Sequence, residues 1–184
     1  SKMTLNAAVI TATLTGNWNA AATWNGPIPS AGDDVIISGG RVVTVFAGTS
    51  FTVNSITIGS NANSANSLVM ASNTSSLTVT NTITIVPSTI GANARNNVLN
   101  VSSGYIICNG LNSSNSGIAN KDCNISISTG TLDVNGNATL GNNAAQNAFT
   151  FTGGGTFRVS GAFTGGGNIT SALGNLEYYG GAQI

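Results

Sequence analysis

The chain has 184 residues, of which 41% are hydrophobic and only ten are charged, five of each sign, and it contains no histidine. Disordered chains are usually poor in apolar residues and rich in charge, so this composition predicts one folded domain. The same inventory excludes a basic surface for nucleic acid and nucleophile–histidine catalysis, and no apolar run approaches the roughly 20 residues of a membrane span.

Strand-forming residues dominate the sequence. Asn, Gly, Thr and Ser together make up just over half of the chain, whereas strong helix formers such as Glu, Lys and Met are scarce. Thr, Val and Ile occur in alternating runs, with Gly, Asn and Ser between the runs. This pattern is typical of short β-strands joined by turns, and it predicts an all-β fold.

The first fifty residues differ from the rest and contain both tryptophans, Trp18 and Trp24. A repeat protein must cover the core and the backbone edge of its terminal coil, so we expect residues 1–50 to form an N-terminal capping region. We interpret the two tryptophans as part of its core, although they are alternatively platforms for sugars. For Asp33 we expect a turn or capping role, because it and Asp34 alone cannot supply the six to eight oxygens of a calcium site.

Residues 15–45 read TGNWNAAATWNGPIPSAGDDVIISGGRVVTV. The order Gly-x-Trp, Thr-Trp-x-Gly, Pro, Gly-Asp-x-Val-x-Ile and Val-x-Val resembles the N-terminal region of many secreted Bacteroidota surface proteins. It is also similar to the opening of G8-type modules. The resemblance implies a right-handed parallel β-helix on a secreted or cell-surface protein, commonly exported by the type IX route. Such proteins are frequently adhesins, and their partners would be surface glycans, other extracellular proteins or neighbouring domains of the same chain.

Later segments repeat one pattern, an apolar-x-apolar strand, a polar turn and a second such strand. Its first apolar residues, Leu77, Leu99, Ile125 and Phe149, are separated by 22, 26 and 24 residues. A period near 24 predicts the coils of a repeat architecture. Third strands are expected at 138–140 and 162–164. We therefore predict that residues 51–184 form six to seven coils of a right-handed parallel β-helix (β-solenoid) that continues in a longer protein.

Aligning the coils predicts which side chains stack. Two columns should point inward and one between them should point outward, because strand side chains alternate. The expected inward columns are Ile83, Ile106, Leu132, Phe157, Leu176 and Ile85, Cys108, Val134, Val159, Tyr178. The expected outward column is Thr84, Ile107, Asp133, Arg158, Glu177. Its last three members alternate in charge, so we interpret Asp133, Arg158 and Glu177 as a structural charge ladder that supports this register.

The same alignment predicts an exposed face of small polar residues on the first strand of each coil. Its two columns are Thr78, Asn100, Ser126, Thr150 and Thr80, Ser102, Ser128, Thr152. A plain soluble surface explains them most simply. Two functional alternatives are a shallow glycan-binding surface and a hydroxyl array of the kind that ice-binding solenoids use.

Cys108 and Cys123 are the only cysteines and flank a polar segment. They are either small buried apolar residues or the two ends of a disulfide, which an exported protein permits. Such a bond would close a loop of about 15 residues and add roughly 3 kcal/mol. Of the two, we favour the disulfide. Two cysteines without histidine do not suggest a metal site.

The sequence contains few residues that could act in catalysis, with five carboxylates and no histidine. A glycoside hydrolase needs two carboxyl groups about 5 to 9.5 Å apart. Asp133 and Glu177 would lie two rungs apart with Arg158 between them, and a charge ladder explains all three. We therefore expect no catalytic residue, metal or cofactor, and predict a non-catalytic structural or adhesive segment of a secreted cell-surface protein. The alternatives are a carbohydrate-binding or carbohydrate-active β-helix module and, third, an ice-binding solenoid.

Overall fold

The computed structural model describes residues 7–60, 63–90, 95–115, 117–118, 122–141, 143, 146–165, 168–171 and 173–180. In these residues the secondary structure consists of β-strands and one 3-10 turn, η1 (Ala21–Thr23), with no α-helix. The strands are β1 (Val9–Thr11), β2 (Gly16–Asn17), β3 (Asp34–Ile37), β4 (Val42–Val45), β5 (Ser50–Val53), β6 (Ser55–Ile58), β7 (Ser67–Met70), β8 (Ser76–Ile85), β9 (Asn97–Val101), β10 (Tyr105–Ser113), β11 (Cys123–Ile127), β12 (Thr131–Val134), β13 (Ala138–Thr139), β14 (Ala148–Phe151), β15 (Thr156–Val159), β16 (Phe163–Thr164), β17 (Asn168–Ser171) and β18 (Asn175–Tyr178).

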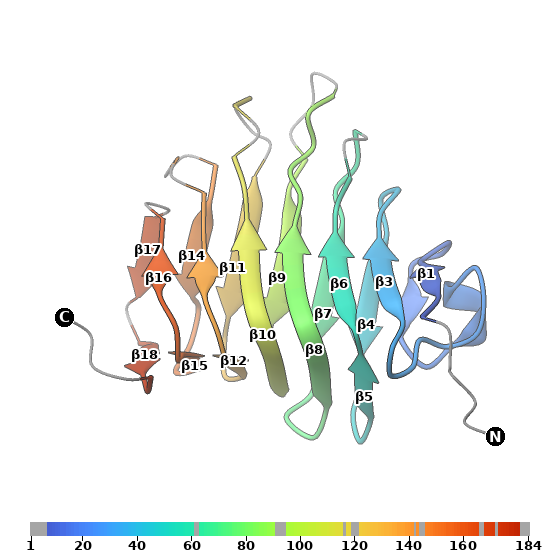
Figure 1. The fold of residues 1–184 in the computed structure, drawn as a ribbon, viewed down its shortest axis with the longest axis horizontal. Helices are drawn as coiled ribbons and strands as arrows, with labels where there is room; N and C mark the ends of the chain where they lie inside the picture. The colour runs from blue at the N-terminus through green and yellow to red at the C-terminus, as the bar shows by residue number, and fades with distance from the viewer. Residues whose placement is uncertain are drawn as a thin grey trace.

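The chain winds as a parallel β-helix, which confirms the predicted fold class. Every pair of named strands is parallel, and the coils follow one another along the long axis from β1 to β18 (Figure 1). We define three faces by their strands. Face 1 contains β2, β4, β7, β9, β11, β14 and β17. Face 2 contains β5, the first halves of β8 and β10, and β12, β15 and β18. Face 3 contains β1, β3, β6, the second halves of β8 and β10, and β13 and β16.

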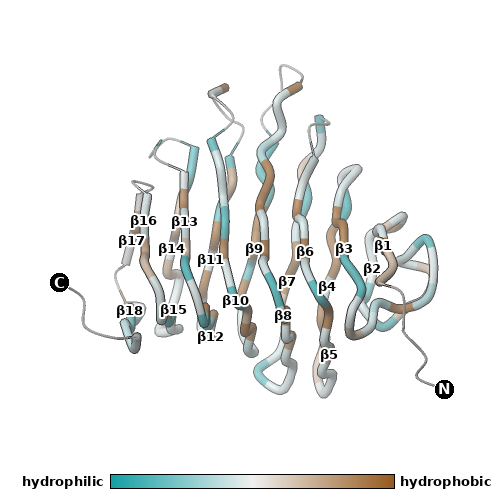
Figure 2. Tube along the Cα trace, viewed as in Figure 1, coloured by the Kyte–Doolittle hydropathy of each residue, from teal (hydrophilic) through white to brown (hydrophobic). Residues whose placement is uncertain are grey.

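Alternation along each strand fills the interior. Most strands alternate buried and partly exposed residues, so apolar side chains point inward and Thr, Ser and Asn point outward. Figure 2 shows the same alternation as changes of hydropathy along each strand. In the coil of β14, β15 and β16, the rings of Phe149 and Phe157 lie 4.8 Å apart, and Phe163 packs 5.5 Å from Phe157. Stacked side chains from all three faces therefore form one continuous core.

The predicted register is correct from β9 onward and wrong for β8. Ile106 pairs with Leu132 and Leu132 with Phe157, as expected. On its other side, however, Ile106 pairs with Leu77, and Ile83 pairs with Leu111. The physical reason is that β8 is a ten-residue strand that covers two faces, so its two apolar halves belong to different columns. Residues 67–70, which form β7, supply the face 1 strand that the alignment had assigned to the first half of β8.

Buried amides bridge the coils at the corner between face 3 and face 1. Asn66 and Asn97 occupy equivalent inward positions and are almost fully buried. The side-chain oxygen of Asn97 accepts hydrogen bonds from the backbone and side-chain nitrogens of Asn66 at 3.0 and 2.8 Å. Asn97 Nδ2 in turn donates to the carbonyl of Val86 at 2.6 Å. Such a ladder satisfies the polar groups that a corner would otherwise leave unpaired in the core.

The N-terminal end is closed by a segment that turns back across the first coil. Trp18 is fully buried, and its ring lies 5.1 Å from that of Trp24 and 5.7 Å from that of Phe51. Trp24 Nε1 donates to the carbonyl of Trp18 at 2.7 Å. Within the predicted capping region, residues 1–50, closure is thus provided by the segment around η1, while β3 and β4 are regular coil strands.

Among the described residues there is no helix with the length and apolarity needed to cross a membrane.

Candidate functional site

A cluster of charged and polar side chains lies on the outer surface of face 2. Asp133, Arg158 and Glu177 occupy consecutive positions of one outward column on β12, β15 and β18. Arg158 Nη1 lies 2.6 Å from Asp133 Oδ2, and Arg158 Nε lies 3.1 Å from Glu177 Oε2. The charge ladder expected from the sequence is present, with arginine as its central member.

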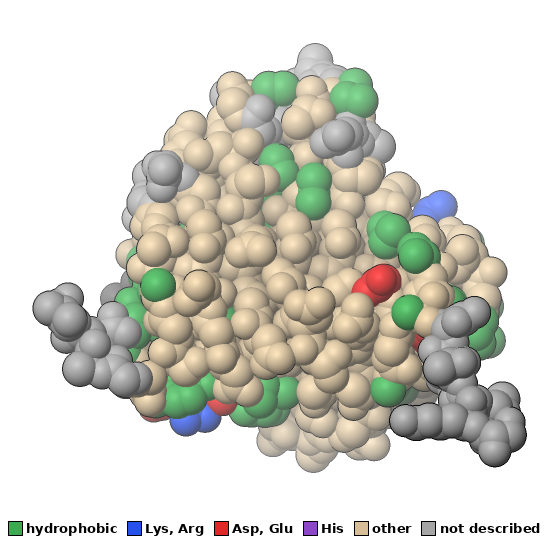
Figure 3. Space-filling model, viewed as in Figure 1, with side chains coloured by type: hydrophobic (Ala, Val, Ile, Leu, Met, Phe, Trp, Pro, Cys, Tyr) green, Lys and Arg blue, Asp and Glu red, His purple; other side chains and the backbone are tan. Residues whose placement is uncertain are grey.

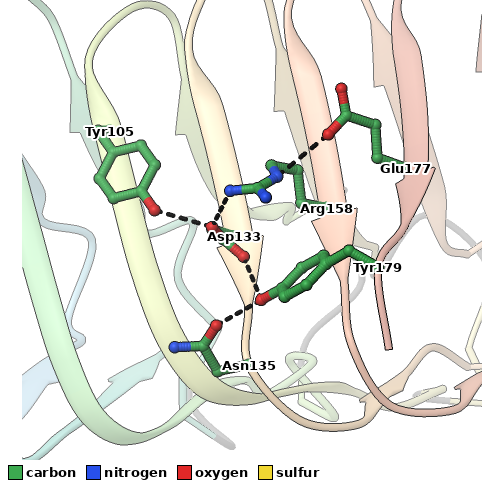
Figure 4. Close-up of polar contacts among 6 residues, drawn as sticks. All are labelled: Tyr105, Asp133, Asn135, Arg158, Glu177 and Tyr179. Atoms are coloured by element: carbon green, nitrogen blue, oxygen red, sulfur yellow. Dashed lines mark hydrogen bonds and ion pairs between the residues drawn. The ribbon is translucent and has the colours of Figure 1, made fainter. Parts of the chain in front are cut away.

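Two tyrosines and an asparagine complete this cluster, and the sequence analysis missed all three. The hydroxyl groups of Tyr105 and Tyr179 donate to Asp133 Oδ2 and Oδ1 at 2.8 and 2.7 Å (Figure 4). The Tyr179 hydroxyl is also paired with the side-chain oxygen of Asn135, and its ring lies 4.6 Å from the guanidinium of Arg158. These side chains cover Asp133, so an outward carboxylate is only 3% exposed. The available signal was positional, because Tyr105 begins β10, the strand beside β12, and Tyr179 directly follows β18.

The electrostatics of the cluster favour a fixed arrangement. Burial, together with the hydrogen bond and negative charge of Asp133, raises the pKa of Tyr105 to about 12. The same causes raise the pKa of Tyr179, and the charge of Asp133 raises the pKa of Arg158. Both phenols are therefore protonated donors near neutral pH, and the guanidinium stays charged. Hydrogen bonds and ion pairs from these protonated and charged donors hold the side chains of the cluster in place.

The predicted polar face is divided between two faces of the helix. Asn100, Ser126 and Thr150 do form one outward column of face 1, and Ser102, Ser128 and Thr152 directly follow the ends of the same three strands. Thr78 and Thr80 lie elsewhere. Thr78 is on face 2, where it pairs with Thr52 and Ile107, and Thr80 ends that half of β8. Val69 takes the place expected for Thr78 beside Asn100, so the hydroxyl array is shorter than predicted.

A longer polar column, which the sequence analysis missed, runs along face 3. Register links its members directly, and they are Thr57, Thr84, Asn112, Thr139 and Thr164. The hydroxyls of Thr164 and Thr139 are hydrogen-bonded to each other at 3.3 Å. Assigning Thr84 to the column of Ile107 concealed this ladder, since the sequence did not show which two faces the corner inside β8 joins. Its members are uncharged and mostly exposed, as on the surrounding surface (Figure 3).

The expected disulfide is absent, because Cys108 and Cys123 are both free and buried. Cys108 lies inward on face 2 between Val79 and Val134. Cys123 lies on face 1, where β11 pairs with β9, and its thiol donates to the carbonyl of Ile85 at 3.5 Å. The two residues belong to different sheets and fill separate inward columns. Burial raises the pKa of each thiol to about 12, so both are poor nucleophiles.

Asp33 has the capping role expected for it. Its carboxylate accepts hydrogen bonds from the backbone nitrogen and hydroxyl of Ser30, at 2.8 and 2.9 Å, and from the backbone nitrogen of Ala8 at 3.2 Å. Burial opposes the charged form, but these hydrogen bonds outweigh it and lower the pKa of Asp33. Asp34 accepts from Asn54 Nδ2 and Ser55 Oγ, at 2.7 and 2.5 Å, and thereby joins β3 to the next coil.

Three buried oxygens at the same corner between face 3 and face 1 accept no hydrogen bond. They belong to Asn96, Asp122 and Gln146, which precede the equivalent residues Asn97, Cys123 and Asn147 of successive coils. Burial alone raises the pKa of Asp122. A calcium ion would need six to eight oxygens, and this column offers three. No group of three or more His, Cys, Asp or Glu side chains converges in the described part of the chain.

Across the described ranges, the surface has no pocket that would enclose a ligand. The surface in Figure 3 is mostly uncharged polar side chains and backbone, with isolated charged groups. No family model, curated protein or solved structure matches this chain.

Proposed function

We propose that this chain is a non-catalytic structural or adhesive segment of a secreted cell-surface protein. The observation that carries the proposal is a filled apolar interior beneath outer faces that have no enclosing pocket in the described residues. Faces 1 and 3 carry columns of uncharged hydroxyl and amide groups, with strands about 4.8 Å apart, and such faces suit a stiff spacer or an extended contact surface.

The state of the carboxylates supports the non-catalytic part of the proposal. Asp133 is bonded to Arg158 and to two tyrosine hydroxyls, and Glu177 is bonded to the same arginine. A hydrolase needs one carboxyl group that can give up a proton and another that faces the bond or a water molecule. Here Asp133 has no free oxygen, and a guanidinium lies between the two carboxylates.

Location outside the cell is a further part of the proposal. It rests on the resemblance of residues 15–45 to the N-terminal region of secreted Bacteroidota surface proteins. The near absence of charge agrees with a segment that meets its partners through hydroxyl and amide groups instead of long-range electrostatic attraction.

Incubation with neutral and acidic polysaccharides tests the proposal. The purified chain should release neither new reducing ends nor unsaturated products above the level of a buffer control. Asp133→Asn and Glu177→Gln variants serve as matched controls. Product release by the wild-type chain that both variants abolish would contradict a non-catalytic role.

A second candidate function is glycan binding at the face 2 cluster. The specific observation is that Tyr179 remains 41% exposed beside Asp133 and Arg158, so an aromatic ring and hydrogen-bonding groups lie together. Retention on immobilised glycans should then fall in Tyr179→Ala and persist in Thr164→Ala, a face 3 control. Equal retention of both variants and the wild type would reject this candidate.

A further inference from the structure

The C-terminal coil exposes apolar residues in columns that the interior coils bury. Ile169 lies in the column of Phe149, and Leu176 and Tyr178 lie in the columns of Phe157 and Val159. Phe149, Phe157 and Val159 are at most 1% exposed, whereas Ile169, Leu176 and Tyr178 are 43%, 45% and 43% exposed. Leu173, in the turn between β17 and β18, is 70% exposed. Together these side chains form an apolar patch at the end of the core.

Backbone groups at this end are also unpaired on one side. β17 is the terminal strand of face 1, where it pairs with β14, and β18 is the terminal strand of face 2, where it pairs with β15. In the described residues neither strand has a second neighbour. An exposed strand edge accepts another strand through main-chain hydrogen bonds, and the side-chain pockets beside it select the sequence.

The charged column of face 2 indicates which type of residue should lie over β18. The outward column alternates between acidic and basic residues, from Asp133 through Arg158 to Glu177. Glu177 is paired with Arg158 on one side only, and its side chain is 52% exposed. Continuing the alternation requires a basic residue over Glu177. A second copy placed with β18 against β18 across a two-fold axis would instead bring two Glu177 side chains together, which is unfavourable.

We propose that the edge of β17 and β18 binds a further parallel β-solenoid coil, with an apolar-x-apolar strand over β17 and an apolar-basic-apolar strand over β18. This chain contains a coil with that pattern. Ala148–Phe151 supplies two apolar residues for face 1, and Thr156–Val159 reads Thr-Phe-Arg-Val for face 2. The occupant is defined by this pattern, and the inference does not depend on the proposed function.

The test appends a copy of residues 141–160 after Ile184 of the full chain. Amide hydrogen exchange should slow by about tenfold or more in β17 and β18, because each strand gains a hydrogen-bonded neighbour. A matched control carries Phe149→Asp and Phe157→Asp in the appended copy only. A second variant carries Arg158→Glu in that copy, and should show weaker protection of β18 than the unaltered copy.

Two results would overturn the proposal. One is exchange in β17 and β18 that is unchanged by the appended coil, or slowed equally by its aspartate variant. The other is concentration-dependent dimerisation of the unextended chain, measured by sedimentation equilibrium, that Leu176→Lys abolishes, since the edge would then be occupied by a second copy. A monomeric unextended chain and selective protection by the unaltered coil support the proposal.

Discussion

The two ends of this β-helix differ in how completely they cover the apolar core. At the N-terminal end, Thr11 on the outer strand β1 donates to Asn25 Oδ1 at 2.8 Å and accepts from the Asn25 backbone nitrogen at 2.9 Å. Trp18 and Trp24 cover the core beneath. At the C-terminal end the outermost inward residues, including Leu176, remain about half exposed. Stacking propagates a core indefinitely, so closing it requires a segment that leaves the repeat pattern.

The difference also explains where the sequence departs from its own repeat. The segment around η1 contains both tryptophans and follows no apolar-x-apolar pattern, because its task is to cover a coil and not to extend it. β18 keeps the apolar-x-apolar pattern with Leu176 and Tyr178, whereas β17 keeps only its first apolar residue, Ile169. The C-terminal coil therefore differs from an interior coil mainly in the exposure of its inward side chains.

The largest effect should come from opening the closed end. Trp18→Ala removes a fully buried indole and should lower the free energy of unfolding by about 3–5 kcal/mol. Leu176→Ala at the open end, the matched comparison, should cost less than about 1.5 kcal/mol because that side chain is already half exposed. Urea unfolding followed by circular dichroism measures both. Equal losses would remove the distinction between the ends.

The second largest loss of stability should come from removing the Asp33 carboxylate, which accepts hydrogen bonds from Ala8 and Ser30. Asp33→Asn keeps the shape but loses a charged acceptor, and should cost about 1–3 kcal/mol at neutral pH. The pKa of Asp33 is lowered by folding, so its contribution is complete above the unfolded pKa of about 3.9 and is lost as pH falls through the folded value. The gap between wild type and variant should therefore narrow in acid, as urea midpoints at about pH 6 and pH 3 would show. A constant gap would contradict this assignment.

On face 2, the two ion pairs of Arg158 should contribute unequally to the stability of the folded chain. Arg158→Met leaves the buried carboxylate of Asp133 without its cation and should lower the midpoint of thermal unfolding more than any change at Glu177. Glu177→Gln alters an exposed pair at the open edge and should change stability by less than about 0.5 kcal/mol. Thermal unfolding of both variants and their double mutant measures the two bonds separately. A larger loss from Glu177→Gln would show that the edge pair is the stronger one.

One small expected effect is a gain in stability. Asp122 has a buried oxygen without a hydrogen bond, and burial raises its pKa, so ionisation above that pKa destabilises the folded chain. Asp122→Asn should stabilise the protein by up to about 1 kcal/mol near neutral pH and by less in acid. Denaturant midpoints at the two pH values test the sign. Destabilisation at neutral pH would mean that the carboxylate has a partner.

Sequence patterns predicted the coils well and the corners poorly. Apolar alternation identified β10, β12 and β15 and the Asp133, Arg158, Glu177 column, because alternation reports directly on which side of a strand is buried. The break inside β8 at Asn81 was assigned to the corner between faces 1 and 2, since an interrupted alternation does not show which two faces the corner joins. That one error misplaced Thr78, Thr80 and Thr84.

The side-chain cluster and the cysteines were beyond sequence reasoning for a related reason. Tyr179 reaches Asp133 from two coils away, and such a contact depends on the direction of a ring instead of on a spacing. For Cys108 and Cys123, the distance along the chain suited a disulfide, but the faces to which they belong did not. Assigning a residue to a face requires the corners, and the corners were the uncertain element.

Residue-resolved amide hydrogen exchange of the unmodified chain tests the central claim, a helix closed at its N-terminal end and open at its C-terminal end, most directly. We predict protection that is high in β3 through β12, persists at β1 where Trp24 and Asn25 cover the edge, and falls at β17 and β18. Loss of protection at β1 before β18, or equal protection at both ends, would contradict it.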